Sequence, residues 1–192
     1  MYIALTGGIG SGKSYVCRLL KDYGVEVYDC DSAAKRLMNS MPEVQRALSE
    51  AVGCDLFAGG RLDKAALSRF IVKSEENVRK INSIVHPAVA DDFKRSGHEW
   101  LESAILYESG FDRRIDFGFV VCVTAPLETR IRRIMERDSL TRERAVEWID
   151  RQMPQEEKAA RADFVVDNDG GNDVEAQIRE LMNKINQQSK HI

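Results

Sequence analysis

The stretch ALTGGIGSGKSY, residues 4–15, decides the fold of this chain. It contains the complete pattern G-x-x-x-x-G-K-[ST], whose fixed positions are Gly7, Gly12, Lys13 and Ser14. Glycines let backbone N–H groups turn inward around a phosphate, and a following helix adds the partial positive charge of its N-terminus. A lysine at this place can reach the β- and γ-phosphates, and the serine hydroxyl can hold Mg²⁺. The stretch therefore predicts a loop that binds the phosphates of a nucleotide.

The residues on either side of the loop have the pattern of a βαβ unit. YIAL, residues 2–5, is a short apolar run of the kind found in buried parallel strands. SYVCRLLKDYG, residues 14–24, has helical apolar spacing and ends in a glycine. VEVYDCD, residues 25–31, follows as a second strand that ends in acidic residues. This order predicts a parallel sheet with helices on both faces.

The remaining chain completes an α/β fold of the P-loop NTPase type. Residues 32–97 are helical in pattern, with helix starts expected at Pro42, Asp63 and Pro87 and a helix end at Gly97. The sheet resumes in EWLESAIL and FGFVVCVTAP, and ADFVVDN is the last expected strand. Later helices are expected to be capped by Thr141 and by a capping box of Asn172 and Glu175. We predict a core (1–31, 98–137 and 161–192), an inserted helical acceptor-binding domain (32–97) and a short helical lid (138–160).

Composition is that of one globular domain with insertions. The chain has 192 residues, of which 43% are hydrophobic and 31% charged. Its net charge of −3 provides no polycation for nucleic acid or an anionic membrane. The four cysteines form no C-x-x-C pair, and neither a signal peptide nor an apolar run of about 20 residues is present. We therefore expect a cytoplasmic protein, monomeric or weakly homo-oligomeric, that binds neither nucleic acid nor membrane.

The phosphate loop alone does not choose among GTPases, ATPases and kinases. The sequence has no Asn/Thr-Lys-x-Asp element for guanine and no D-x-x-G switch after the second strand. Motor and transport ATPases have longer cores. The small size, the helical insertion and the arginine-rich stretch RIRRIMER indicate a small-molecule kinase.

Two acidic residues mark the end of the second strand. Asp29 and Asp31 lie at the carboxyl edge of the sheet, where open parallel sheets bind ligands. Residues two apart share a face while the strand lasts, so both carboxylates are expected to face the phosphate loop. One can take the proton from an attacking hydroxyl while the other supports it. The alternative that Asp31 merely caps the following helix stays open.

Seven blocks of the chain resemble the dephospho-CoA kinase family in order and spacing. They are LTGGIGSGKS, YDCDSAAK, GRLDKAAL, VHP, LYESGFD, RIMERD and ARADFVVDN, and the resemblance spans residues 3 to about 186. It implies that ATP and Mg²⁺ are used to phosphorylate the ribose 3′-hydroxyl of dephospho-CoA, which completes coenzyme A synthesis. Two rivals are a kinase for another small acceptor, such as a nucleoside monophosphate, and a non-catalytic ATP-sensing protein.

The same resemblance implies roles for individual residues. Asp31 corresponds to the catalytic base, Asp29 to its supporting acid on the substrate side, and His86 to a residue that lines the dephospho-CoA site. The ATP-binding residues are Gly10, Ser11, Gly12, Lys13, Ser14 and Tyr15, with Ser14 as the metal ligand.

Three positions after the insertion also correspond to family site residues. Arg133 and Arg137 are four apart, share a helix face, and resemble lid arginines. Arg137 is the one expected to act on the moving phosphoryl group, and Arg133 to contact substrate. Asn168 resembles the residue at the adenine.

The chain departs from the family pattern at three places. Tyr15 stands where threonine is usual, Ala104 where proline is common, and Pro154 where serine is common. Tyr15 leaves open whether a hydroxyl lies near the α-phosphate, and Ala104 leaves open the path of the backbone beside the substrate. Pro154 indicates a stiffer lid hinge. The roles of two further acids, Glu102 and Glu108, are left open.

Overall fold

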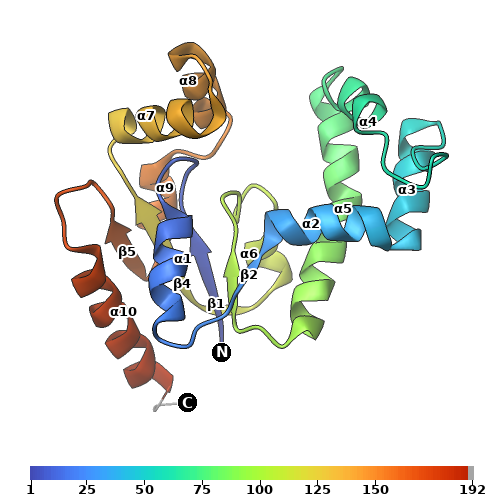
Figure 1. The fold of residues 1–192 in the computed structure, drawn as a ribbon. Coiled ribbons are helices and arrows are strands. Elements are labelled where there is room, and N and C mark those ends of the chain that lie inside the picture. The colour runs from blue at the N-terminus through green and yellow to red at the C-terminus, as the bar shows by residue number, and fades with distance from the viewer. Residues whose placement is uncertain (190–192) are drawn as a thin grey trace. The chain divides into compact units, whose positions relative to one another are not determined.

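The computed structural model describes residues 1–189, and Figure 1 shows its elements. The chain divides into two compact units. Unit 1 combines Met1–Tyr28 with His98–Ile192, and unit 2 is Asp29–Gly97.

Unit 1 is built on a five-stranded sheet in the order β2-β3-β1-β4-β5. Its strands are β1 (Tyr2–Thr6), β2 (Val27–Asp29), β3 (Trp100–Glu102), β4 (Phe117–Thr124) and β5 (Phe164–Asp167). β1 pairs in parallel with β3 and β4, and β4 pairs in parallel with β5. The predicted parallel sheet is confirmed, with the phosphate-loop strand β1 at its centre.

The strand expected over EWLESAIL is much shorter than its apolar pattern. β3 ends at Glu102, and the Ser103 hydroxyl then accepts the N–H of Ile105 at 3.3 Å. A serine that bonds the backbone two residues on turns the chain out of the extended state. The acid at the end of β3 is thereby left at the carboxyl edge of the sheet.

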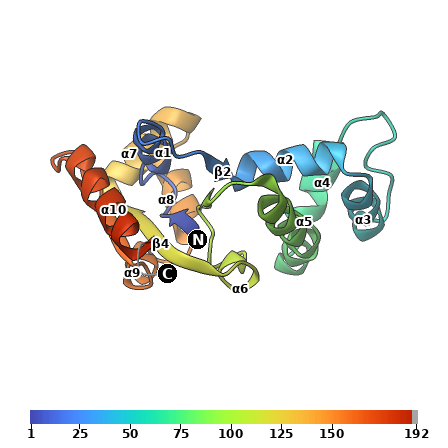
Figure 2. The same ribbon diagram turned by 90° about the horizontal axis from the view of Figure 1, so that it is seen from below.

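Helices cover both faces of this sheet. The helices of unit 1 are α1 (Lys13–Lys21), α6 (Phe111–Arg114), α7 (Leu127–Asp138), α8 (Arg142–Asp150), α9 (Gln155–Ala160) and α10 (Val174–Ser189). Figure 2 shows α1 and α10 on one side of β4, with α6 and α9 on the other. Alternate residues of the strands pack under α1 and α10 with Val16, Leu20, Ile178 and Leu181. This core holds the loop between β1 and α1 in place.

Caps define where the later helices begin. Thr141 caps α8 as predicted, because its hydroxyl accepts the N–H of Arg144 at 3.4 Å. The prediction that Asn172 and Glu175 form a capping box is wrong. Asp173 accepts the N–H of Ala176 at 2.9 Å and is the capping residue, while the Asn172 amide donates to Asp167. Two neighbouring residues with equal capping preference cannot be separated by sequence alone.

Unit 2 is a group of four helices, α2 (Cys30–Ser40), α3 (Pro42–Val52), α4 (Lys64–Ile71) and α5 (Glu75–Ser96). The other three pack on α5, as Figure 1 shows. Its core is apolar and is formed by Leu37, Leu48, Leu67, Val85 and Phe93, among others. The predicted helix starts at Pro42 and Asp63 are confirmed.

The predicted helix start at Pro87 is wrong. α5 begins after Ser74, whose hydroxyl accepts the N–H of Asn77 at 3.2 Å, and Pro87 lies inside the helix. Proline removes one helical hydrogen bond. The helix continues through it because its apolar face, including Val85 and Val89, is buried. Gly97 ends the helix at φ 79°, as predicted.

The free cysteines differ in burial, and this predicts their reactivity. Cys122 is fully buried, and burial raises the pKa of its thiol to about 11. Because only the thiolate reacts, and a raised pKa lowers its fraction, iodoacetamide at mildly alkaline pH should modify exposed Cys54 long before Cys122. Peptide mass spectrometry over a time course measures this, with guanidinium-unfolded protein as the control. Equal rates in native protein would contradict the buried position of Cys122.

Within residues 1–189, the structure contains no helix with the length and apolar character that a membrane crossing requires.

Candidate active site

The phosphate loop joins the carboxyl end of β1 to the first turn of α1. Gly7, Gly10 and Gly12 have φ values of 142°, 80° and 98°, which disfavour residues with a Cβ. The Ser11 N–H donates to the Gly8 carbonyl at 3.1 Å, and the N–H groups of Tyr15 and Val16 donate to the Gly12 carbonyl. The G-x-x-x-x-G-K-[ST] pattern thus forms a closed turn at a helix N-terminus.

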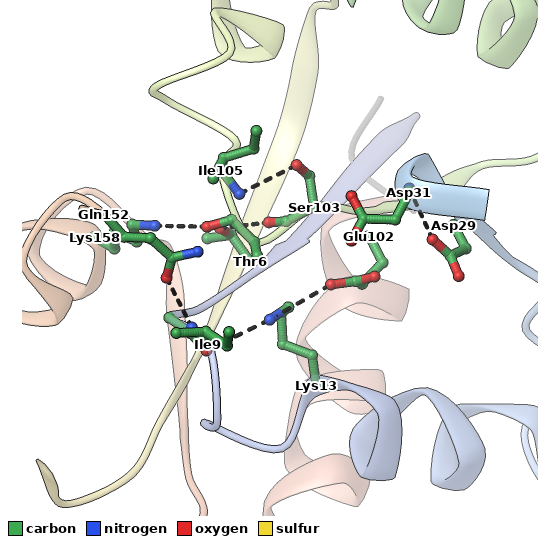
Figure 3. A network of polar contacts seen from close by, with 12 residues as sticks. Thr6, Ile9, Lys13, Asp29, Asp31, Glu102, Ser103, Ile105, Gln152 and Lys158 are labelled. Carbon is green, nitrogen blue, oxygen red and sulfur yellow. Dashed lines mark hydrogen bonds and ion pairs between the residues drawn. The ribbon is translucent and has the colours of Figure 1, made fainter. Parts of the chain in front are cut away.

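Lys13 lies beside an acid of the neighbouring strand. Its Nζ is 3.6 Å from Oε1 of Glu102 and 3.5 Å from the Gly8 carbonyl oxygen, as Figure 3 shows for the ion pair. Both side chains are largely buried, with 11% and 18% exposed. Glu102, whose role was open from the sequence, therefore lies at the phosphate loop. Its carboxylate provides a negative charge beside Lys13.

The outer side of the loop is held by side chains from α7 and from the end of β5. Arg130 Nε donates to the Ile9 carbonyl at 3.0 Å, and Asn168 Nδ2 donates to the Ser11 carbonyl at 2.9 Å. Arg133 donates to the carbonyls of Gly10 at 3.3 Å and Ser11 at 3.1 Å. Arg133 and Asn168, predicted to contact substrate and adenine, are thus brought to the loop.

Sequence reasoning missed Arg130. It is only 6% exposed, and burial lowers the pKa of its guanidinium. Its spacing of three residues before Arg133 places both on one face of α7, a pattern that was available in the sequence.

The segment that follows α8 is attached to the phosphate loop and to β4. The Gln152 side-chain oxygen accepts the N–H of Ile9 at 2.8 Å (Figure 3). The Gln155 side chain bonds both the N–H and the carbonyl of Ala125, each at 3.1 Å. Pro154 lies between these glutamines and precedes α9. The C-terminal part of the predicted lid is therefore anchored by hydrogen bonds on both sides of Pro154.

A buried lysine connects α9 to the segment after β3. Lys158 has 0% exposure, and its Nζ lies 2.6 Å from the Ala104 carbonyl oxygen and 2.8 Å from Glu108 Oε1. The same Glu108 oxygen accepts the N–H of Met153 at 2.8 Å. Glu108, the second acid of open role, is thus the partner of a buried ammonium group.

This pair predicts a stability effect. Replacing Glu108 with alanine leaves the Lys158 ammonium buried without its counter-charge, which should lower the free energy of unfolding by about 3 kcal/mol. The double variant Glu108→Leu/Lys158→Met should recover most of the loss, since it buries no charge. Urea unfolding measures both. A loss below about 1 kcal/mol for Glu108→Ala would show that the pair behaves like a surface ion pair.

Asp29 and Asp31 do not share a strand face. β2 ends at Asp29, and α2 begins at Cys30. The Asp29 carboxylate caps α2, accepting the N–H of Asp31 at 2.9 Å and of Ser32 at 3.1 Å, and the Ser32 hydroxyl at 2.8 Å. Figure 3 shows the contact between Asp29 and Asp31. The capping alternative for Asp31 is also wrong, because Asp31 is an exposed acid in the first turn of α2.

The other predicted residues occupy several places. Ser14 and Tyr15 are in the first turn of α1, where the Arg18 guanidinium lies 5.5 Å from the centre of the exposed Tyr15 ring. Arg137, one turn beyond Arg133, is 60% exposed and pairs with Asp138 at 2.7 Å. His86 lies in α5 of unit 2. The functional roles of these residues stay predictions.

The oxygen donors at the loop suit a magnesium ion that arrives with a nucleotide. Residues 1–189 contain no cluster of three or more His, Cys, Asp or Glu side chains able to hold a metal by themselves. Ser14, in the first turn of α1, supplies a hydroxyl, which is a hard oxygen donor. Mg²⁺ commonly takes one or two protein oxygens and completes its shell with phosphate oxygens and water. The residues present fit that ion.

Solved structures with the same architecture include several kinases. A crystal structure of TT1252 from Thermus thermophilus is 36% identical, with a TM-score of 0.74 and 97% of each chain covered. The fold is shared by a dephospho-CoA kinase from Campylobacter jejuni, with a TM-score of 0.66, 21% identity and 98% of each chain covered. It is also shared by a shikimate kinase from Acinetobacter baumannii, with a TM-score of 0.53, 14% identity, and 98% of this chain and 94% of that chain covered.

Sequence comparisons give a more specific result. The family model for dephospho-CoA kinase matches residues 1–174. A dephospho-CoA kinase of Bacteroides fragilis is 41% identical over 187 residues, which cover 94% of this chain and 90% of that protein. A dephospho-CoA kinase from Thermus thermophilus is 39% identical over 175 residues, which cover 88% of this chain and 83% of that protein. The chain therefore belongs to the dephospho-CoA kinase family.

Proposed function

We propose that this protein transfers the γ-phosphoryl group of ATP to the ribose 3′-hydroxyl of dephospho-CoA, yielding coenzyme A and ADP. The observation that carries the proposal is the family match over residues 1–174, which includes the complete phosphate loop. In the reaction the bond between the γ-phosphorus and the β,γ-bridging oxygen breaks. A bond from that phosphorus to the 3′-oxygen forms, and the hydroxyl proton goes to a base.

The donor side of the reaction belongs to the loop. Backbone N–H groups and the N-terminus of α1 receive the phosphates, and Lys13 exchanges its contact with Glu102 for the β- and γ-phosphates. The Ser14 hydroxyl would hold Mg²⁺, which supplies charge neutralisation between those phosphates. The contact of Tyr15, in the first turn of α1, with the nucleotide is part of the proposal, and Asn168 lies against the Ser11 carbonyl of the loop.

We propose that the acceptor binds to unit 2. Residues 32–97 of this unit are the proposed acceptor-binding domain. Asp31 is the proposed base, which takes the proton of the 3′-hydroxyl. Its position in the first turn of α2 depends on Asp29, which caps that helix. Asp29 is therefore assigned a supporting role, and His86 a place along the dephospho-CoA site.

The lid, residues 138–160, closes over the reacting groups in this proposal. Arg137 neutralises charge on the moving phosphoryl group, for which it must exchange its contact with Asp138. Closure excludes water and so limits ATP hydrolysis. The anchored segment around Gln152 and Gln155 provides a fixed base for that movement.

The test is ADP release by the purified protein with ATP and Mg²⁺, comparing dephospho-CoA, a panel of nucleoside monophosphates, and no acceptor. We expect release with dephospho-CoA only, with coenzyme A as the product. Release with a monophosphate instead would overturn the acceptor but keep the mechanism. Tight ATP binding without acceptor-dependent release would favour an ATP sensor.

A further inference from the structure

We propose that Arg130, Arg133 and Asn168 are positioning residues, an outer clamp that orients the N–H groups of the phosphate loop from behind. The inference rests on the proposed function only in taking the loop's ligand to be a nucleotide phosphate. It assigns Arg133 and Asn168 a role other than direct contact with substrate or adenine.

The clamp bonds three successive carbonyl groups of the loop. The Ile9 carbonyl accepts a hydrogen bond from Arg130 at 3.0 Å, and the Gly10 carbonyl accepts one from Arg133 at 3.3 Å. The Ser11 carbonyl accepts two, from Arg133 at 3.1 Å and from Asn168 at 2.9 Å. In a trans peptide, the carbonyl of one residue and the N–H of the next point in opposite directions. Holding the Ile9 and Ser11 carbonyls on the clamp side therefore turns the N–H groups of Gly10 and Gly12 to the other side, while the Ser11 N–H donates to the Gly8 carbonyl within the loop. That is the side on which a phosphate can be bound.

The glycines of the loop are crowded from the same direction. A Cβ added at Gly8 or at Gly12 would lie under 3.0 Å from the side chains of Arg130 and Asn168, respectively. A Cβ at Gly10 would lie 2.7 Å from the Arg130 carbonyl oxygen. Glycine at these positions therefore serves the approach of the clamp as well as the approach of phosphate. A surface arginine pair would produce no such crowding.

The members of the clamp are themselves held in place. Asn168 is 6% exposed, its N–H donates to the Thr124 carbonyl at 2.8 Å, and its side-chain oxygen accepts from Arg133 at 3.4 Å. Arg130 is 6% exposed at the start of α7, the helix that packs on α8 of the lid. The clamp therefore joins the rigid end of β5 and the base of the lid to the phosphate loop.

Two variants remove clamp contacts with little change of shape. Arg133→Met keeps the length of the side chain without its donors, and Asn168→Asp places an acceptor opposite the Ser11 carbonyl. Arg132→Met, at an exposed arginine of the same helix, is the matched control. Asn168→Asp also keeps the proposal testable if Arg133→Met folds poorly, which thermal unfolding reports.

Hydrogen exchange of the ligand-free protein separates positioning from ligand contact. The amides of Ser11, Tyr15 and Val16 are bonded within the loop turn. Both clamp variants should exchange them about tenfold faster, with residues 29–97 unchanged, while Arg132→Met should match the parent protein. Unchanged exchange at the loop in both clamp variants would overturn the proposal.

Binding of inorganic pyrophosphate, measured by calorimetry beside ADP, is the second readout. Because pyrophosphate has no adenosine, a positioning role predicts that both dissociation constants rise by a similar factor of about ten. A rise for ADP alone would show contact with the adenosine part and overturn the proposal. Lysine in Arg133→Lys can donate to one carbonyl but cannot bond two carbonyls as a guanidinium does. The dissociation constants of Arg133→Lys should therefore lie between those of the parent protein and of Arg133→Met. Neither readout involves an acceptor, so failure of dephospho-CoA as substrate would leave this result intact.

Discussion

Replacing Lys13 with alanine should lower kcat/KM for ATP by about 10²–10³-fold, the range found when one preorganised charge-stabilising donor is lost. The loss has two parts here. The phosphates lose a cation at the start of α1, and the Glu102 carboxylate, 3.6 Å from Lys13 Nζ, loses its ion pair with that cation. Steady-state ADP release with varied ATP measures the effect.

A second substitution separates these two parts. In the Lys13→Ala background, Glu102→Gln should recover part of the ATP KM, because the repulsive charge is gone, but little of kcat. Lys21→Ala, at an exposed lysine in the last turn of the same helix, is the matched control and should behave as the parent protein. A loss below about tenfold for Lys13→Ala would mean that the loop backbone binds the phosphates without help from the lysine.

Replacing Asp31 with asparagine should lower kcat by about 10²–10⁴-fold, the usual contribution of a general base, with KM for dephospho-CoA little changed. Asparagine has the same shape and remains in the first turn of α2, and the Asp29 cap is untouched. Glu43→Gln, at another exposed first-turn acid of unit 2, should keep full activity. Coenzyme A formation by the Asp31→Asn protein at the parent rate would remove the base from the mechanism.

Much of the fold follows from local patterns that have one physical solution. The glycine pattern before Lys13 requires a strand on one side and a helix on the other, and both are present as β1 and α1. Asp63 and Thr141 precede apolar helical runs and cap them. Local signals failed where two solutions were equally good. Pro87 satisfies a helix start and is also tolerated within α5, where burial of the apolar face outweighs one lost hydrogen bond.

The acid pair shows the same limit at the site. VYDCD is compatible with a strand through Asp31 and with a strand that ends at Asp29 and caps a helix. The second arrangement satisfies two backbone N–H groups at the start of α2, which a continued strand would not do. The sequence placed both acids at the end of β2 and predicted the wrong geometry between them.

Contacts across long stretches of chain were beyond sequence reasoning. Gln152 bonds the N–H of Ile9 across 143 positions, and Arg130 bonds its carbonyl across 121. Periodicity tells which face of a helix is polar, but it does not name the partner that the polar face meets. Lys158 is the clearest case, because a lysine in a charged run is ordinarily solvated, whereas this one is fully buried.

The strand order also affects how the protein is made. β1 is synthesised well before its neighbours in the sheet, β3 and β4, which begin at Trp100 and Phe117. The helices α2 to α5 contact one another within the segment between β2 and β3, so they can fold before β3 is made. β1 must meanwhile wait, unpaired, for about a hundred residues of synthesis. The phosphate loop that begins at its end therefore belongs to the late-folding part of the chain, and substitutions that slow pairing of β1 with β4 should lower the yield of folded enzyme before they change its catalysis.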